Sequence, residues 1–202
     1  MTITWLGHSC FLLESGGFRV LLDPYHSVPG LPDVSAEADA VYCSHDHFDH
    51  NHTQNVRLTA GREDPFTVTE VPSFHDDQGV ALRGGNTIRR FQAEGLSVVH
   101  LGDLGCALTA EQIAALRPCD ALLVPVGGFY TIDAQGAKAV AEALSPRVIV
   151  PMHYRTEAFG LREIDTVEPF LALFSKELVR HYDANRLELT ADTPAQVAVL
   201  SV

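Results

Sequence analysis

Four apolar runs in this chain each lead to a histidine or an aspartate, and this pattern restricts the fold more than any other feature. The runs have the length and the β-branched content of strands. They are Ala38–Ser44 before His45, Phe66–Val71 before His75, Leu96–Leu101 before Asp103, and Arg147–Met152 before His153. In α/β proteins, binding and catalytic residues gather where strands end, because the sheet holds the following loops rigidly. We therefore predict an α/β fold in which these side chains meet at one sheet edge.

The stretch with the most candidate metal ligands is His45-Asp46-His47-Phe48-Asp49-His50. His45 and His47, two residues apart, would lie on one face of an extended segment. The turn that follows would direct Asp49 and His50 to a second position nearby. Imidazole nitrogen and carboxylate oxygen are the ligands of zinc sites that stay open to water and substrate. A solvated loop rich in His and Asp is the alternative, but solubility does not require this spacing. The stretch predicts a catalytic centre able to hold two metals.

The remaining sequence predicts a single domain over residues 1–202, in which strands and helices alternate. Its 46% hydrophobic content is sufficient for a substantial core. An opening meander is expected over residues 2–6, 10–14 and 18–22, with Gly16-Gly17 in a hairpin turn. Thr109 and Gln112 form a capping-box pattern before a helix. Two further helical stripes consist of Ala137, Val140, Ala141 and Leu144, and of Val167, Phe170, Leu171 and Phe174.

Longer motifs around the candidate ligands resemble the metallo-β-lactamase superfamily, in particular the compact bacterial branch that includes ascorbate-6-phosphate lactonase-like proteins. The resemblance runs from about residue 2 to about residue 157. It rests on His45-x-His47-x-Asp49-His50, Gly102-Asp103 and Pro151-Met152-His153-Tyr154, and on residues 5–9, 22–24, 73–77, 83–88, 100–105 and 125–133. Cys106 departs from it, because proteins of this branch often carry histidine there. The resemblance implies a four-layer αβ/βα sandwich.

The resemblance also implies which residues would bind two divalent metal ions. The expected ligands are His45, His47 and His75 for the first ion, Asp49, His50 and His153 for the second, and Asp103 as a bridge between them. Zinc is the expected metal, although manganese, iron and nickel also accept such ligands. A hydroxide shared by the ions would attack the substrate, so Asp49 and Asp103 count as catalytic residues. The two carboxylates and the hydroxide leave the centre about one unit positive, which permits an anionic substrate.

Other histidines and one aspartate are expected beside the ligands. His8, after the first strand, is a candidate catalytic residue that would donate a hydrogen bond or carry a proton, with a packing role as the alternative. Asp23 is expected to orient a metal-bound histidine, and His100 to support the ligands without being one. We interpret the other three histidines as structural or surface residues: His26, His52 and His181.

Five residues are candidates for substrate binding. Arg83 and Asn86 fall in a glycine-rich segment that we interpret as a loop, where they could bind a phosphate or a carboxylate. A solvated turn is the alternative there. Tyr130, Tyr154 and Arg155 follow other motifs of the resemblance and are expected to face the substrate.

Three function classes remain open, and hydrolysis of a small ester, lactone or phosphodiester is favoured. A nuclease of the same fold is the first alternative. The formal net charge of −12 disfavours it, because nucleic-acid binding usually needs basic patches. Di-iron redox chemistry or metal sensing is the second alternative. Iron-dependent redox relatives often place glutamate within the histidine motif, where this chain has His47.

Partners and compartment follow from what the sequence lacks. Residues 1–4 begin a strand pattern instead of a signal segment, and no run of about eighteen apolar residues occurs. The four cysteines form no Cys-x-x-Cys pair, which disfavours a disulfide framework or a thiolate zinc site. We expect a cytoplasmic protein that binds a small molecule, without a membrane partner, and the sequence leaves a homo-oligomer open.

Overall fold

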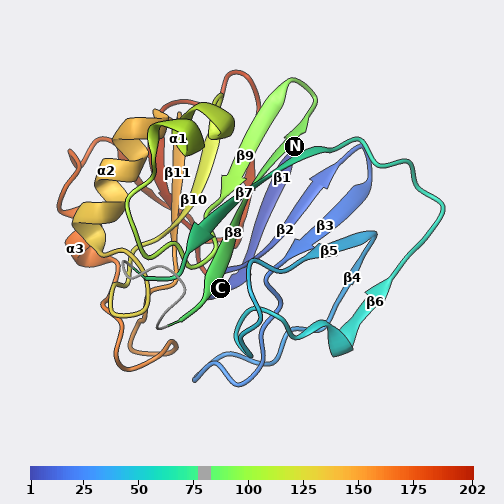
Figure 1. Ribbon diagram of the computed structural model, residues 1–202, viewed down its shortest axis with the longest axis horizontal. Coiled ribbons are helices and arrows are strands. Elements are labelled where there is room, and N and C mark those ends of the chain that lie inside the picture. Colours follow the sequence, from blue (N-terminus) through green and yellow to red (C-terminus); the bar gives the residue numbers. More distant parts are fainter. Residues whose placement is uncertain (77–82) are drawn as a thin grey trace.

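Two β-sheets pack face to face in the computed structural model, which describes residues 1–76 and 83–202 (Figure 1). The smaller sheet is largely antiparallel and contains the N-terminal meander. Its strands, in spatial order, are β13 (Arg186–Glu188), β1 (Thr2–Gly7), β2 (Cys10–Ser15), β3 (Phe18–Leu22) and β5 (Ala40–Tyr42). A separate pair consists of β4 (Ala36–Ala38) and β6 (Val56–Leu58), with a 3-10 turn at Thr53–Asn55. The predicted meander is confirmed.

The larger sheet carries most of the strands that lead to candidate ligands. Its spatial order is β12 (Val179–His181), β14 (Gln196–Val199), β11 (Val148–Met152), β10 (Ala121–Pro125), β9 (Leu96–His100), β8 (Gly85–Ala93) and β7 (Thr67–Phe74). The strands from β12 to β9 are parallel. Since β8 is antiparallel to both β7 and β9, these two also run in one direction. The ends of β7, β9 and β11 therefore lie at one edge, as the sequence predicts.

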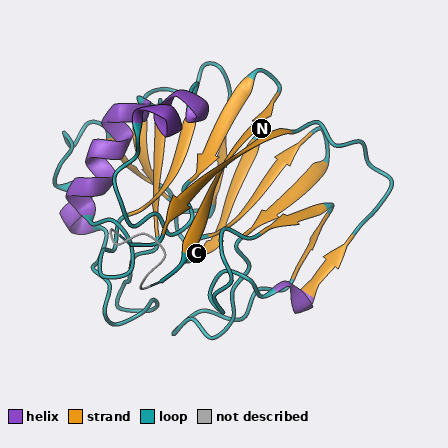
Figure 2. Ribbon diagram, viewed as in Figure 1, coloured by secondary structure: helices purple, strands orange, loops and turns teal. Residues whose placement is uncertain are grey.

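Helices cover the outer face of the larger sheet (Figure 2). They are α1 (Ala110–Leu116), α2 (Ala134–Leu144) and α3 (Glu168–Leu171). The predicted capping box of Thr109 and Gln112 starts α1, and the four apolar residues predicted for α2 are all buried. The stripe from Val167 to Phe174 forms only the short α3, whose N-cap Val167 makes no side-chain hydrogen bond. No helix formed by the described residues is long and apolar enough to cross a bilayer.

The main core lies between the two sheets. Alternating residues of the meander, among them Trp5, Phe11 and Leu13, point into it and meet side chains of the larger sheet such as Phe91. Strands β9, β10 and β11 are buried along their whole length, as expected for parallel strands covered on both faces. The mixed α/β sandwich is confirmed.

The outer face of the smaller sheet also buries apolar side chains. Cys10 and Leu21 point away from the main core and pack with Tyr25, Val28 and Val34 in a second cluster. Irregular chain after β3 therefore covers this face, whereas helices cover the opposite one. This segment directly follows Asp23, so its packing also helps to fix the position of Asp23.

Candidate metal centre

The candidate ligands converge although they come from both sheets. His45 follows β5 of the smaller sheet, and His75, Asp103 and His153 follow β7, β9 and β11 of the larger one. Their donor atoms form overlapping groups whose members lie within 4.8 Å of one another. These groups are His45, His47 and His75; His8, Asp49, His50 and His153; and His45, His50 and Asp103. All seven residues predicted as ligands are therefore brought together in this part of the structure.

The carboxylate of Asp103 lies between the other ligands. Its Oδ2 is 3.3 Å from Nε2 of His75 and 3.2 Å from Nε2 of His153. Its Oδ1 is 3.2 Å from Nε2 of His50. Asp103 is only 2% exposed, so these neighbours replace most of its contact with water. The carboxylate therefore faces histidines of both ligand groups.

The turn after β9 places this carboxylate. Gly102 has a φ of +54°, and a Cβ there would lie 2.3 Å from Oδ1 of Asn86 and 2.5 Å from Cβ of Ser44. The Asp103 amide donates to Oδ1 of Asn86 over 3.0 Å. Nδ2 of Asn86 donates to Oγ of Ser73 and to the carbonyl of Leu101. Glycine at 102 and the Asn86 amide thus fix the backbone that carries the ligand.

This arrangement corrects the prediction for Asn86. The sequence places it in a loop facing substrate, but it lies on strand β8 and is buried. Its side-chain oxygen and nitrogen both bind protein groups. The strand begins earlier than the glycine pattern indicates because Gly85 and Asn86 pair with Phe74 and Ser73 of β7.

Buried partners aim three histidines at the centre. Nδ1 of His50 lies 2.9 Å from Oδ2 of Asp23, which also accepts hydrogen bonds from the hydroxyl of Ser44. That hydroxyl lies 2.9 Å from Nδ1 of His45. Nδ1 of His75 lies 3.0 Å from the carbonyl oxygen of Tyr130. Engaging Nδ1 leaves Nε2 directed inward, the arrangement common in metal-bound histidines. The structure places Asp23 where the sequence predicts it, against a candidate ligand.

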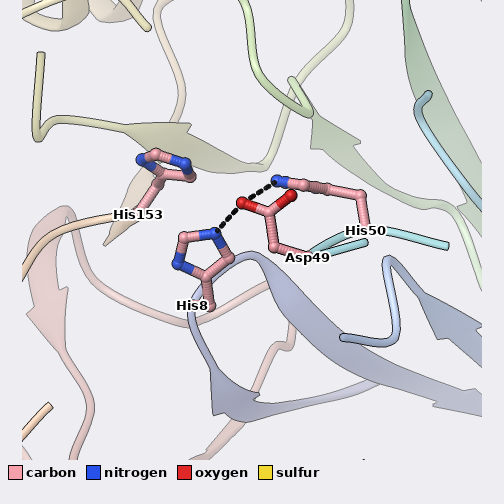
Figure 3. A group of neighbouring side chains, drawn as sticks. All are labelled: His8, Asp49, His50 and His153. Carbon is pink, nitrogen blue, oxygen red and sulfur yellow. Dashed lines mark hydrogen bonds and ion pairs between the residues drawn. The ribbon is translucent and has the colours of Figure 1, made fainter. Parts of the chain in front are cut away.

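His8 belongs to the group that also contains Asp49, His50 and His153 (Figure 3). Its Nε2 is 3.3 Å from Oδ2 of Asp49, and its ring centroid is 4.2 Å from that of His153. The residue is buried and has a φ of +51°, which is costly for a side chain with a Cβ. Its carbonyl accepts hydrogen bonds from Nε1 of Trp5 and from the amide of His153. These bonds hold the imidazole against Asp49.

Burial and charge set the protonation of the ligands. Burial and, to a smaller extent, the neighbouring His50 lower the pKa of His45 to about 3. Burial also opposes charge on His50, but Asp103 outweighs it and raises the pKa of His50 well above its usual range. Burial would raise the pKa of Asp103, yet the charges of His153 and His50 hold it well below its usual range. The carboxylate is therefore ionised, and a bound cation would take over the role of a protonated histidine.

Several inward-facing atoms have no hydrogen-bond partner among the described residues. They are Nε2 of His45, His50 and His153, and Oδ1 of Asp103. The close approaches of His50 and His153 to Asp103 do not have the geometry of hydrogen bonds. Unpaired buried polar atoms are costly, and a group of them that converges is typical of a cation-binding site. The nitrogen and oxygen donors fit zinc or a similar divalent metal.

A cavity of about 280 Å³ opens beside the ligands. It is lined by His47, Phe48, Asp49, His75, Arg83, Asp103, Tyr130 and Leu161. The guanidinium carbon of Arg83 is 5.4 Å from the ring centroid of Tyr130 and 5.9 Å from that of Phe129. The structure thus brings two of the predicted substrate residues, Arg83 and Tyr130, to the cavity. Asp77, which belongs to one of the sequence motifs, falls outside the described residues.

The structure places Tyr154 and Arg155 in other contacts. His153 has a φ of +52°, and the chain after it turns into the protein. The Tyr154 ring is 3% exposed and lies 5.5 Å from the Trp5 ring. Nε of Arg155 donates to the carbonyl of Ile164 over 2.8 Å. Both ring nitrogens of His100 are also engaged, since Nε2 lies 2.9 Å from the carbonyl oxygen of Ser9 and Nδ1 accepts from the amide of Gly102. Local turn geometry, which the sequence does not reveal, explains these placements.

Two apolar residues of the cavity, Phe48 and Leu161, are not predicted from the sequence. Phe48 stands between ligands in the histidine motif, and an apolar residue at such a position is a signal that could have been used. It is 50% exposed. Leu161 lies in a loop far along the chain and carries no local signal.

Comparison with known proteins identifies the family. The family profile described as beta-lactamase superfamily domain matches residues 2–153. The chain belongs to this superfamily. It is 31% identical to a UPF0173 metal-dependent hydrolase of Archaeoglobus fulgidus, over 82% of this chain and 87% of that one. A UPF0173 metal-dependent hydrolase of Carboxydothermus hydrogenoformans is 30% identical, with 77% and 85% covered.

A solved structure supports the same conclusion. The protein from Thermotoga maritima, assigned to the Zn-dependent hydrolases of the metallo-beta-lactamase superfamily, has a TM-score of 0.77. The two chains are 35% identical, and the match covers 98% of this chain and 97% of that one. The predicted fold and superfamily are confirmed.

Proposed function

We propose that the protein is a hydrolase that uses two divalent metal ions to cleave a small, anionic ester, lactone or phosphodiester. The observation that carries this proposal is the position of Asp103, whose two oxygens face histidines of both ligand groups. One tetrahedral ion cannot use seven ligands, whereas two ions that share a carboxylate can. The relatives named as metal-dependent hydrolases support the reaction class.

The ligand residues divide between the two ions. His45, His47 and His75 would hold the first, Asp49, His50 and His153 the second, and Asp103 both. Bound zinc or a similar ion would acidify a water molecule and polarise the carbonyl or phosphoryl group that is attacked. The protein sets the spacing through Asp103 and the orientation through the hydrogen bonds that Asp23 and Tyr130 make to ligand histidines.

Other residues would bind and orient the substrate. The cavity places Arg83 and Tyr130 beside His75 and Asp103. Arg83 is the one cationic side chain of the described lining, apart from the histidines, and a guanidinium can bind a phosphate or carboxylate through two hydrogen bonds. His8, hydrogen-bonded to Asp49, would hold that carboxylate in the orientation required by the second ion.

The alternatives receive less support from the site. Binding of a nucleic-acid backbone usually needs many basic side chains. The described cavity lining has a single cation other than histidine, and the formal net charge of the chain is −12. Redox chemistry would need iron at the centre. Metal content measured with activity separates it from hydrolysis.

Elemental analysis combined with an activity screen tests the proposal. Protein reconstituted separately with zinc, manganese and iron is expected to bind two ions per chain. It should hydrolyse at least one member of a panel of lactones, thioesters, phosphodiesters and cyclic nucleotides. His153→Ala should abolish turnover, whereas His181→Ala, an exposed histidine on β12, should retain it. Saturation at one ion under metal excess, or an iron centre that cycles between redox states without hydrolysis, would refute the proposal.

A further inference from the structure

We infer that the substrate carries an apolar group beside its anionic group, and that Phe48 and Leu161 bind this apolar group while Arg83 binds the anion. The inference rests on the proposed function and deepens it by naming the substrate class. It depends on how the cavity lining is divided between charged and apolar side chains.

Arg83 forms the anionic subsite. Its guanidinium lies near the rings of Phe129 and Tyr130, and such contacts restrict its rotamers. No carboxylate within residues 1–76 and 83–202 forms an ion pair with this guanidinium. The backbone amide of Arg83 donates to Oδ2 of Asp76, and this bond fixes the backbone at Arg83. An oriented guanidinium beside His75 is suited to bind an anion that also approaches the metal ligands.

Phe48 forms one wall of an apolar subsite. It lies between the ligands His47 and Asp49, and half of its surface is exposed. The His26 ring lies edge-on to it at 5.6 Å, and the amide of His26 donates to its carbonyl. The ring lines the cavity together with His47, Asp49 and His75, so a ligand in the cavity would cover it. Its position beside the reacting groups indicates that this ligand is the substrate.

Leu161 forms the other wall, and the fold holds its loop in place. The amide of Gly160 donates to the carbonyl of Pro29 over 2.9 Å. Gly30 has a φ of +79°, and a Cβ there would lie 1.9 Å from the carbonyl oxygen of Ala158. This close approach ties the loop before Leu161 to the segment that covers the smaller sheet. The apolar wall is therefore present before a ligand binds.

The cavity volume limits the size of the apolar group. The volume of about 280 Å³ corresponds to about nine water molecules in the liquid. This is enough for an anion and one ring or short alkyl chain. The substrate class is thus a small amphipathic anion, such as an aryl or short acyl ester that carries a phosphate or carboxylate.

Phosphonates that cannot be hydrolysed test the inference by binding alone. Isothermal titration of the metal-loaded protein would compare methylphosphonate, benzylphosphonate and benzyl alcohol. Benzylphosphonate should bind at least about tenfold more tightly than methylphosphonate, because its ring buries apolar surface in the cavity. Benzyl alcohol, which lacks the anion, should bind at least about tenfold more weakly than benzylphosphonate.

Variants assign each part of the effect to a subsite. Phe48→Ala and Leu161→Ala should each remove most of the preference for the benzyl compound while leaving methylphosphonate affinity within about twofold. Leu58→Ala is the matched control, since Leu58 is 64% exposed on β6, away from the cavity. Arg83→Ala should weaken both phosphonates, whereas Arg186→Ala on β13 should not. Metal content measured on every variant separates ligand binding from loss of the centre.

Equal affinities for the two phosphonates in the unmodified protein would overturn the inference. Retention of the benzyl preference in both Phe48→Ala and Leu161→Ala would overturn it as well. Either result leaves the proposed hydrolase untouched, because that depends on two bound metals and on turnover. Absence of turnover with a clear benzyl preference would instead refute the hydrolase and keep the amphipathic subsite.

Discussion

The two ligand groups differ in burial although one short loop supplies residues to both. In the first group His47 is exposed, His45 is half-buried and His75 is buried, and His47 and His75 line the cavity. His8, Asp49, His50 and His153 are all buried. His47 and Asp49 are two residues apart, so their different surroundings arise from the packing of distant segments. We expect the first group, which contains the exposed His47, to be the more accessible of the two to solvent.

The hydrogen bonds that orient the ligands also differ between the two groups. In the second group, Asp23 binds His50 and His8 binds Asp49, both from buried positions. In the first group, the buried Ser44 hydroxyl contacts His45, but His75 is oriented by the carbonyl of Tyr130, a residue that itself lines the cavity. Support from the interior should make the second site more selective and slower to release its metal than the first.

The largest effect is expected where the groups meet. Asp103→Asn removes the charge that both share, so it should weaken binding of both metals and lower kcat/KM at least about a hundredfold, the upper range for losing a supporting residue. Circular dichroism should show an intact fold, because the ligands lie on loops beyond the strands. A variant that keeps two metals and full turnover would exclude the bridging role.

Removal of single ligands should separate the two sites. His153→Ala should empty mainly the second site and His75→Ala mainly the first, so each protein should bind about one ion per chain. With a chelator, the unmodified protein should lose its ions in two phases. The faster phase should come from the first site, which contains the exposed His47. His153→Ala should lack the slow phase. His181→Ala serves as the control, and loss of both ions in either ligand variant would show that the sites do not bind independently.

A change outside the ligand set should affect one site only. Asp23→Asn replaces the carboxylate that orients His50 by a neutral amide of similar size. Affinity at the second site should fall about 10- to 100-fold, whereas the first site should retain its affinity, as measured by competition with a zinc indicator. Equal weakening of both sites would mean that Asp23 acts on the loop as a whole, through its bonds to Ser44.

The smallest effect is expected at His8. His8→Ala removes the hydrogen bond to Asp49 and should lower kcat by about tenfold or less. His8→Gln keeps a donor at this position and should recover part of the loss. If glutamine is as damaging as alanine while both metals remain bound, His8 acts through proton transfer instead of orientation, because only imidazole can carry the proton.

Much of the site follows from local sequence. The spacing of His45, His47, Asp49 and His50, together with three strand-terminal residues elsewhere, predicts the ligand set without tertiary information. This works because a strand fixes the direction of the residues that follow it and parallel strands end at a common edge. Asp23 is predictable for the same reason, since it directly follows β3, whose neighbour β5 leads to His45.

Other predictions depended on features that short motifs do not contain. Asn86 was expected to face substrate, but pairing with β7 draws it into a strand and its amide is used by the Asp103 turn. Tyr154 follows a ligand directly, yet the positive φ of His153 turns the next residues into the aromatic cluster of Trp5. Adjacency to a ligand therefore does not establish contact with substrate.

The sequence by itself determined the class of fold, the candidate metal ligands and the strand ends that carry them, because periodicity and spacing act over a few residues. Only the tertiary structure decided how burial differs between the two ligand groups, and which apolar side chains border the cavity. Leu161 reaches the site because its loop packs against Gly30, more than a hundred residues earlier in the chain. Such contacts result from the packing of distant segments, and no local pattern specifies them.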